Sequence, residues 1–149
     1  MIAAFRAGEG DYIHLQGPAP QQLEADGVGS IVARVGDWVG NCAFSSLAST
    51  PAWLADKPAT AFMRAFRNAR QWVGEAPPQE IAESEQSYFP DVAPAVLADT
   101  IAAYQDLGCW SSQVEIIPEE LAVSIEVFRL AGVVSGEVDP ALVAVAPPG

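Results

Sequence analysis

The chain has 149 residues, half of them hydrophobic, with 19 acidic and 7 basic side chains and a formal net charge of −12 at pH 7. Such a surface repels a phosphate backbone, so we expect no nucleic-acid partner, and because no apolar run approaches ~20 residues we expect no membrane insertion. A mean hydropathy of +0.19 is high for a small domain, and it predicts either a large core or apolar surface that a partner covers.

The first third of the chain is predicted to mix helix and strand. Residues 3–7 end a helix, residues 11–16 are rich in aromatic and β-branched types and predict a strand, and residues 18–25 predict a short helix that starts on a proline. Residues 30–35 predict a second strand, and residues 41–47 a third extended segment. A strand–helix–strand order of this kind is typical of α/β proteins.

The remainder is predicted to be helical and interrupted by prolines. Thr50 is a suitable N-cap and Pro51 a suitable first helical residue, so a helical turn is expected there. Further helices are expected over residues 59–75, about 79–88, 91–107 and 118–131. The predicted fold class is therefore α/β, with a short strand–helix–strand segment followed by a helix-rich C-terminal part.

The expected organisation is one compact unit made of two parts. Residues 1–47 would form the end of an α/β lobe with hinge strands, and residues 48–149 the helical C-terminal part. Two or three strands cannot make a stable sheet alone. A second copy of the chain or a missing lobe would have to complete the sheet, so we expect a homo-oligomer.

Few residues suggest catalysis or metal binding. His14 is the only histidine, and Asp11, three residues before it, would point to the opposite face of the strand. Cys42 and Cys109 are too few for a zinc site and are interpreted as free thiols, although a disulfide between them stays open. No phosphate-binding loop or catalytic serine motif occurs. We expect no enzymatic activity, no metal and no cofactor.

Two charged clusters are interpreted as solvated faces. Arg64, Arg67 and Arg70 are three residues apart on the longest helix and could bind an anion. Glu80 and Glu83 share a face of the next helix and could form a carboxylate pair. In an acidic protein such groups more often face water or form exposed ion pairs that contribute little.

Several short motifs occur in an order that carries a family resemblance. They are residues 3–11 (AAFRAGEGD), residues 15–18 (LQGP), residues 48–58 (ASTPAWLADKP), residues 61–73 (AFMRAFRNARQWV) and the closing segments 88–90, 104–110 and 131–134. In this order the chain resembles the substrate-binding proteins of ABC importers for nitrate, alkanesulfonates, taurine and thiamine precursors. Many members carry glutamate before the proline of the second motif, where this chain has Gly17.

The resemblance implies a partial periplasmic-binding-protein-like fold and a role in binding a small organic or anionic solute. The predicted ligand-binding residues are His14, Gln16, Gly17, Pro18, Asn41 and Phe44. Implied partners are the solute and the membrane subunits of an ABC importer. The family is periplasmic, whereas the chain begins without a signal peptide and would be cytoplasmic if Met1 is its natural start. Alternatives are a self-associating interaction domain and an enzyme like those that form the thiamine pyrimidine, which would depend on His14.

Overall fold

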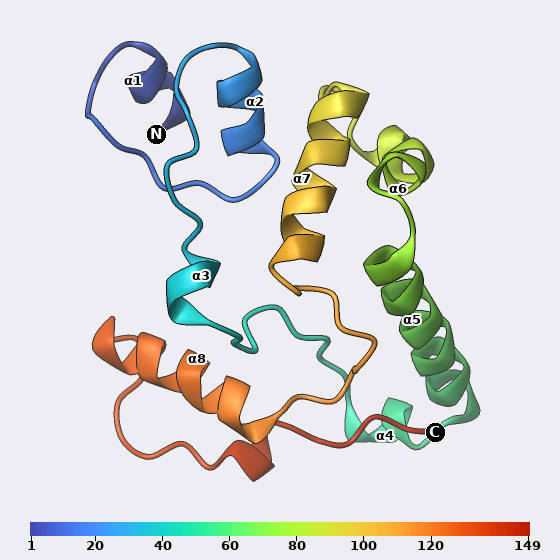
Figure 1. Cartoon of the computed structure of the whole chain (residues 1–149). Helices are drawn as coiled ribbons and strands as arrows, with labels where there is room; N and C mark the ends of the chain where they lie inside the picture. The colour runs from blue at the N-terminus through green and yellow to red at the C-terminus, as the bar shows by residue number, and fades with distance from the viewer. The chain divides into compact units, whose positions relative to one another are not determined.

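The computed structural model describes residues 1–149 and consists of helices joined by irregular segments, with no β-strand (Figure 1). The α-helices are α1 (Ile2–Arg6), α2 (Ala19–Ala25), α3 (Gly36–Val39), α4 (Pro51–Leu54), α5 (Lys57–Glu75), α6 (Pro78–Glu85), α7 (Pro94–Asp106) and α8 (Pro118–Leu130). Two 3₁₀ helices complete the set, η1 (Gln86–Tyr88) and η2 (Pro140–Leu142).

The predicted α/β fold class is wrong, because the segments 11–16, 30–35 and 41–47 form no strand. A strand satisfies its backbone N–H and C=O groups only when a neighbouring strand lies beside it. In this chain, isolated hydrogen bonds take the place of the regular hydrogen bonds between neighbouring strands. The N–H of Ile31 donates to Oε1 of Glu24 at 2.9 Å, and the N–H of Ala43 donates to the backbone carbonyl of Glu120 at 3.1 Å. The apolar, β-branched composition of these segments therefore produces extended loops.

The helical predictions are confirmed to within a few residues, since their signals are local. Pro51, Pro78, Pro94 and Pro118 each stand at the first position of a helix, where the missing N–H costs nothing. Thr50 caps α4 as expected, with its side-chain oxygen accepting from the N–H of Trp53 at 3.3 Å. The single-turn helix α3 and the 3₁₀ helix η2 lie in segments where no helix was expected.

The chain divides into two compact units, each built from two separate stretches of sequence. Unit 1 comprises Met1–Arg34 and Ala76–Leu107, and unit 2 comprises Val35–Glu75 and Gly108–Gly149. Each of the two parts expected from the sequence, residues 1–47 and residues 48–149, thus contributes residues to both units. Each unit is described separately below.

Unit 1 is held together by packing of α6 against α7, which lie side by side (Figure 1). Ile81 of α6 and Leu97 and Ile101 of α7 are all at least 95% buried, and Leu23 of α2 is buried as well. Leu97 and Ile101 are four residues apart and so share one face of their helix. Hydrophobic burial on this face is what fixes the two helices together.

Unit 2 contains much less core. Its buried residues are Ala59, Met63 and Ser124. The aromatic side chains of α4 and α5 pack on one another: Trp53 meets Phe62 edge-on with ring centroids 5.7 Å apart, and Phe62 stacks on Phe66 at 6.3 Å. Phe62 is nevertheless 45% exposed, so the rest of the unit covers this aromatic cluster only in part.

Candidate functional site

Four of the predicted ligand-binding residues belong to unit 1, in the irregular segment before α2. His14 and Gln16 are exposed, whereas Gly17 and Pro18 are half-buried. The backbone N–H of Gly17 donates to Oη of Tyr104 in α7 at 3.0 Å. The turn is therefore fastened to α7, and its role in ligand binding stays a prediction.

Asn41 and Phe44, the other two predicted residues, belong to unit 2 and are exposed. Phe44 stacks on Phe128 of α8, with ring centroids 6.4 Å apart and ring planes 20° from parallel. The neighbouring Ala43 is bonded to α8 through its backbone N–H. This segment thus lies along α8, and the part it would play in ligand binding is likewise a prediction.

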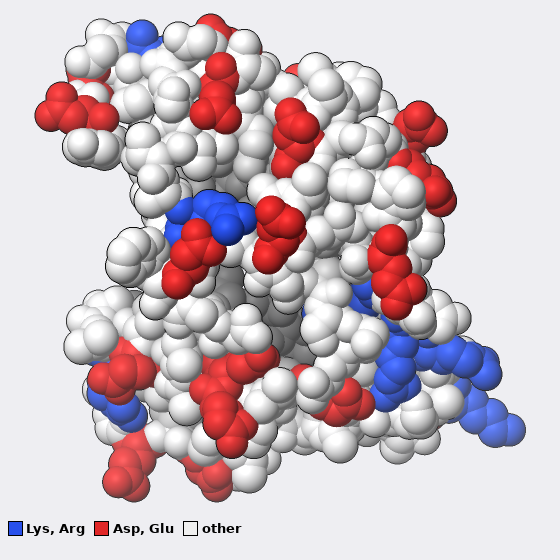
Figure 2. Space-filling model, in the orientation of Figure 1, with Lys and Arg blue, Asp and Glu red and all other residues white.

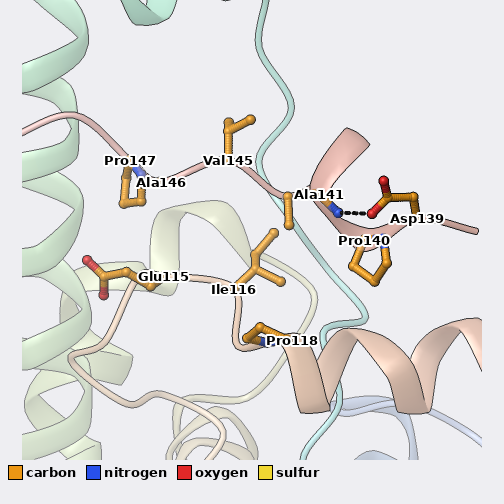
Figure 3. A pocket seen from close by; sticks show the side chains of 10 residues that line it. Glu115, Ile116, Pro118, Asp139, Pro140, Ala141, Val145, Ala146 and Pro147 are labelled. Atoms are coloured by element: carbon orange, nitrogen blue, oxygen red, sulfur yellow. Dashed lines mark hydrogen bonds between the residues drawn. The ribbon is translucent and has the colours of Figure 1, made fainter.

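A cavity of about 530 Å³ lies in unit 2, between the start of α8 and the C-terminal tail (Figure 3). Such a volume falls within the usual range of small-molecule sites. Its wall is mostly aliphatic and is formed by Glu115, Ile116, Pro118, Asp139, Pro140, Ala141, Ala144, Val145, Ala146 and Pro147. Sequence reasoning missed this site, because Ala, Pro and Val in a tail form no recognised motif.

Two carboxylates are the only ionisable side chains in the cavity wall, and they lie at opposite ends of the aliphatic row in Figure 3. Asp139 accepts from the backbone N–H of Ala141 at 2.9 Å through one oxygen. Glu115 is in an ion pair with Arg67 of α5, with Nη2 and Oε1 3.4 Å apart. Hydrogen bonding from its own backbone N–H, and then from Arg67, holds the pKa of Glu115 below its usual value.

The basic side chains are concentrated on α5, which carries four of the seven in the chain (Figure 2). Arg67 donates to the backbone carbonyl of Gly149 as well as pairing with Glu115, and Arg70 donates through Nε to the carbonyl of Ser111 at 2.7 Å. These arginines are therefore more than exposed charges on a helix face. Arg67 and Arg70 hold the segment that precedes α8, and the C-terminal residue, against α5.

Cys42 and Cys109 are free thiols with exposed side chains. Partial desolvation, and next the nearby charge of Cys42, raise the pKa of the Cys109 thiol. The Cys109 thiol therefore ionises less readily than an ordinary cysteine. No three His, Cys, Asp or Glu side chains come together as they would around a metal ion. None of the helices combines the length and apolar character needed to cross a membrane.

The chain is similar to a Bacillus subtilis (strain 168) protein described as "Putative binding protein YtlA". The two are 30% identical over 110 residues, which is 72% of this chain and 33% of that protein. This chain thus spans about a third of the length of the relative that it matches. No protein-family profile and no solved structure matches the chain. The similarity supports a binding role of a general kind.

Proposed function

We propose that this chain is a solute-binding module without enzymatic activity. The observation that carries the proposal is the 110-residue match to a protein described as a binding protein. The cavity of unit 2 supports it, because its volume and aliphatic wall suit a small organic molecule. Binding needs no reacting group, and the wall has no serine, threonine, cysteine, lysine or histidine.

The finer proposal is that the module corresponds to the C-terminal part of an ABC-importer substrate-binding protein. Its support is the order of motifs from residues 3–11 to residues 131–134, together with the match over 72% of the chain. On this proposal the bound solute would be handed to the membrane subunits of the importer, outside the cytoplasm. The matched region is a third of the relative, so the rest of such a protein would supply further ligand contacts.

Ligand-dependent stabilisation tests the module as it stands. A solute at 100 times its Kd is expected to raise the free energy of unfolding by about 2.7 kcal/mol. We expect Ala141→Phe, which places a ring in the cavity, to abolish that stabilisation. Thermal unfolding of the whole chain against a panel of small organic acids, amines and sulfonates provides the measurement.

A matched control separates filling of the cavity from a general effect of added bulk. Ala122 lies on the exposed side of α8 and outside the cavity wall, so Ala122→Phe should leave the response to solute intact. Equal loss in both variants would remove the cavity from the proposal. A panel in which no compound stabilises the chain would count against the binding module itself.

A self-associating interaction domain is the second candidate, and the accessible surface favours it. The chain exposes 10279 Å², whereas two separate globules of the sizes of units 1 and 2 would together expose roughly 8,800 Å². The excess is larger than the ~800 Å² that each partner buries in an ordinary interface. Large apolar side chains contribute to it, with Trp38 85% and Leu130 80% exposed.

Self-association is expected to depend on salt, since each copy has a net charge of −12. Screening of this repulsion should shift the chain from monomer toward dimer as ionic strength rises. Light scattering after size exclusion, across a dilution series at low and high salt, measures the shift. Leu130→Ser should reduce the dimer fraction, and a monomer at every concentration and salt level would contradict the candidate.

A further inference from the structure

We propose that the cavity of unit 2 selects an organic cation, an ammonium group carried on an aliphatic body. This inference rests on the proposed solute-binding function and names its ligand class. It fits the small organic solute that the family resemblance implies and departs from the anionic alternative. The aliphatic wall and the sign of the charges around it carry the inference.

The middle of the cavity is suited to a hydrocarbon chain. Ile116, Pro140 and Val145 present aliphatic side chains between the two ends of the cavity (Figure 3). These residues offer no side-chain hydrogen-bond donor or acceptor. A ligand therefore gains contact energy here by burying CH₂ groups, at about 25 cal/mol per Å² of apolar surface removed from water.

Asp139 is exposed to solvent, and no basic side chain lies in the wall beside it. One carboxylate oxygen accepts from the N–H of Ala141, and the other makes no hydrogen bond or ion pair within the protein. In Figure 3 that second oxygen points away from Ala141. An ammonium group, with three donors and a positive charge, complements such an acceptor.

The Glu115 end is closer to neutral but does not favour an anion. Arg67 balances Glu115, and its guanidinium is also engaged by the carbonyl of Gly149. The start of α8 is the other positive feature near the wall. Its first residue, Pro118, has no N–H to offer, and Glu119 and Glu120 follow in the same turn. A carboxylate or sulfonate would meet two acidic side chains and no basic side chain in the wall.

Three probes of one length separate charge from shape: hexylammonium, 1-hexanol and hexanoate. We expect hexylammonium to bind the whole chain most tightly and hexanoate most weakly, as followed by chemical shifts of the Ala141 and Ala144 amides during titration. Added salt should weaken binding of hexylammonium and leave 1-hexanol unaffected, because only the first interaction is ionic.

Asp139→Asn is the matched variant, since an asparagine oxygen can still accept from Ala141 and preserve η2. It should weaken hexylammonium up to about fivefold, the effect of roughly 1 kcal/mol at the upper end for an exposed ion pair, and leave 1-hexanol unchanged. Glu137→Gln removes the same charge two residues away, outside the wall, and should have little effect on either probe.

The outcomes separate this inference from the function on which it rests. Binding of 1-hexanol or hexanoate in the cavity without preference for hexylammonium would overturn the ligand class and leave the binding module in place. Equal weakening of hexylammonium by Asp139→Asn and Glu137→Gln would overturn it too, because only the overall charge would then matter. Failure of all three probes to shift the cavity amides would remove the cavity as a site.

Discussion

Ile81→Ala is expected to lower the free energy of unfolding of unit 1 by about 2–5 kcal/mol, the usual cost of truncating a buried isoleucine. Ile81 is 2% exposed and lies where α6 meets α7, the most extensive helix contact in the chain. Removal of its side chain leaves a cavity in the core of the unit, which cannot close without moving a helix. The loss is a large share of the 5–15 kcal/mol that stabilises an ordinary domain.

Glu83→Ala is the matched control, because Glu83 lies on the same helix and is exposed. Amide hydrogen exchange along α7 reports on unit 1 alone, so the measurement needs no assumption about the order in which the units unfold. Protection of the amides near Ile101 should fall sharply in Ile81→Ala and stay unchanged in Glu83→Ala. Protection that is equal in the two variants would show that α6 and α7 do not form the core of this unit.

The helices could be predicted because their signals lie within a few residues of one another. Thr50 caps a turn three residues ahead of it, and a proline such as Pro118 marks the first residue of its own helix. Neither signal depends on the rest of the chain. The boundaries of α5, α7 and α8 therefore fall close to those expected from prolines, glycines and apolar spacing.

The strands could not be predicted in this way, because a strand depends on a partner far away in the sequence. Residues 30–35 have the composition of a strand, yet the N–H of Ile31 is satisfied by the side chain of Glu24. Composition measures how well side chains suit a pleated surface, and a neighbouring strand must still be present. The family resemblance implied such neighbours, and the structure of this chain contains none.

The cavity of unit 2 was not predicted from the sequence, and none of the six predicted ligand-binding residues lies in its wall. Gly17 was identified as an unusual position from its place in a motif, and it does make a specific contact, with Tyr104 of α7. The cavity of unit 2 was missed, since it forms only when the tail returns beside the start of α8. Asp139 has a common side chain in an acidic protein, and only its place in a wall without basic side chains distinguishes it.

Gly17→Ala is expected to destabilise unit 1 by about 1–3 kcal/mol, the usual cost of overpacking. A Cβ at residue 17 would lie 2.7 Å from Cγ2 of Thr100 and 3.2 Å from Oη of Tyr104. Thr100 cannot easily move aside, because it is buried and its hydroxyl donates to the carbonyl of Val96 at 2.8 Å. Relief of the clash would have to separate the turn from α7 and break the Gly17–Tyr104 hydrogen bond.

A double-mutant cycle identifies the clash as the cause. Thr100→Ser removes Cγ2 and keeps a hydroxyl for Val96, so it should restore most of the stability lost in Gly17→Ala, as measured by urea unfolding. Gly29→Ala is the control, since its Cβ would meet only the edge of the Phe5 ring at 3.3 Å, and a ring can turn by a few tenths of an ångström. If Thr100→Ser gave no rescue, the turn would not be packed on α7. Loss of solute binding in Gly17→Ala/Thr100→Ser, with stability restored, would instead assign residue 17 the ligand-binding role predicted from the sequence.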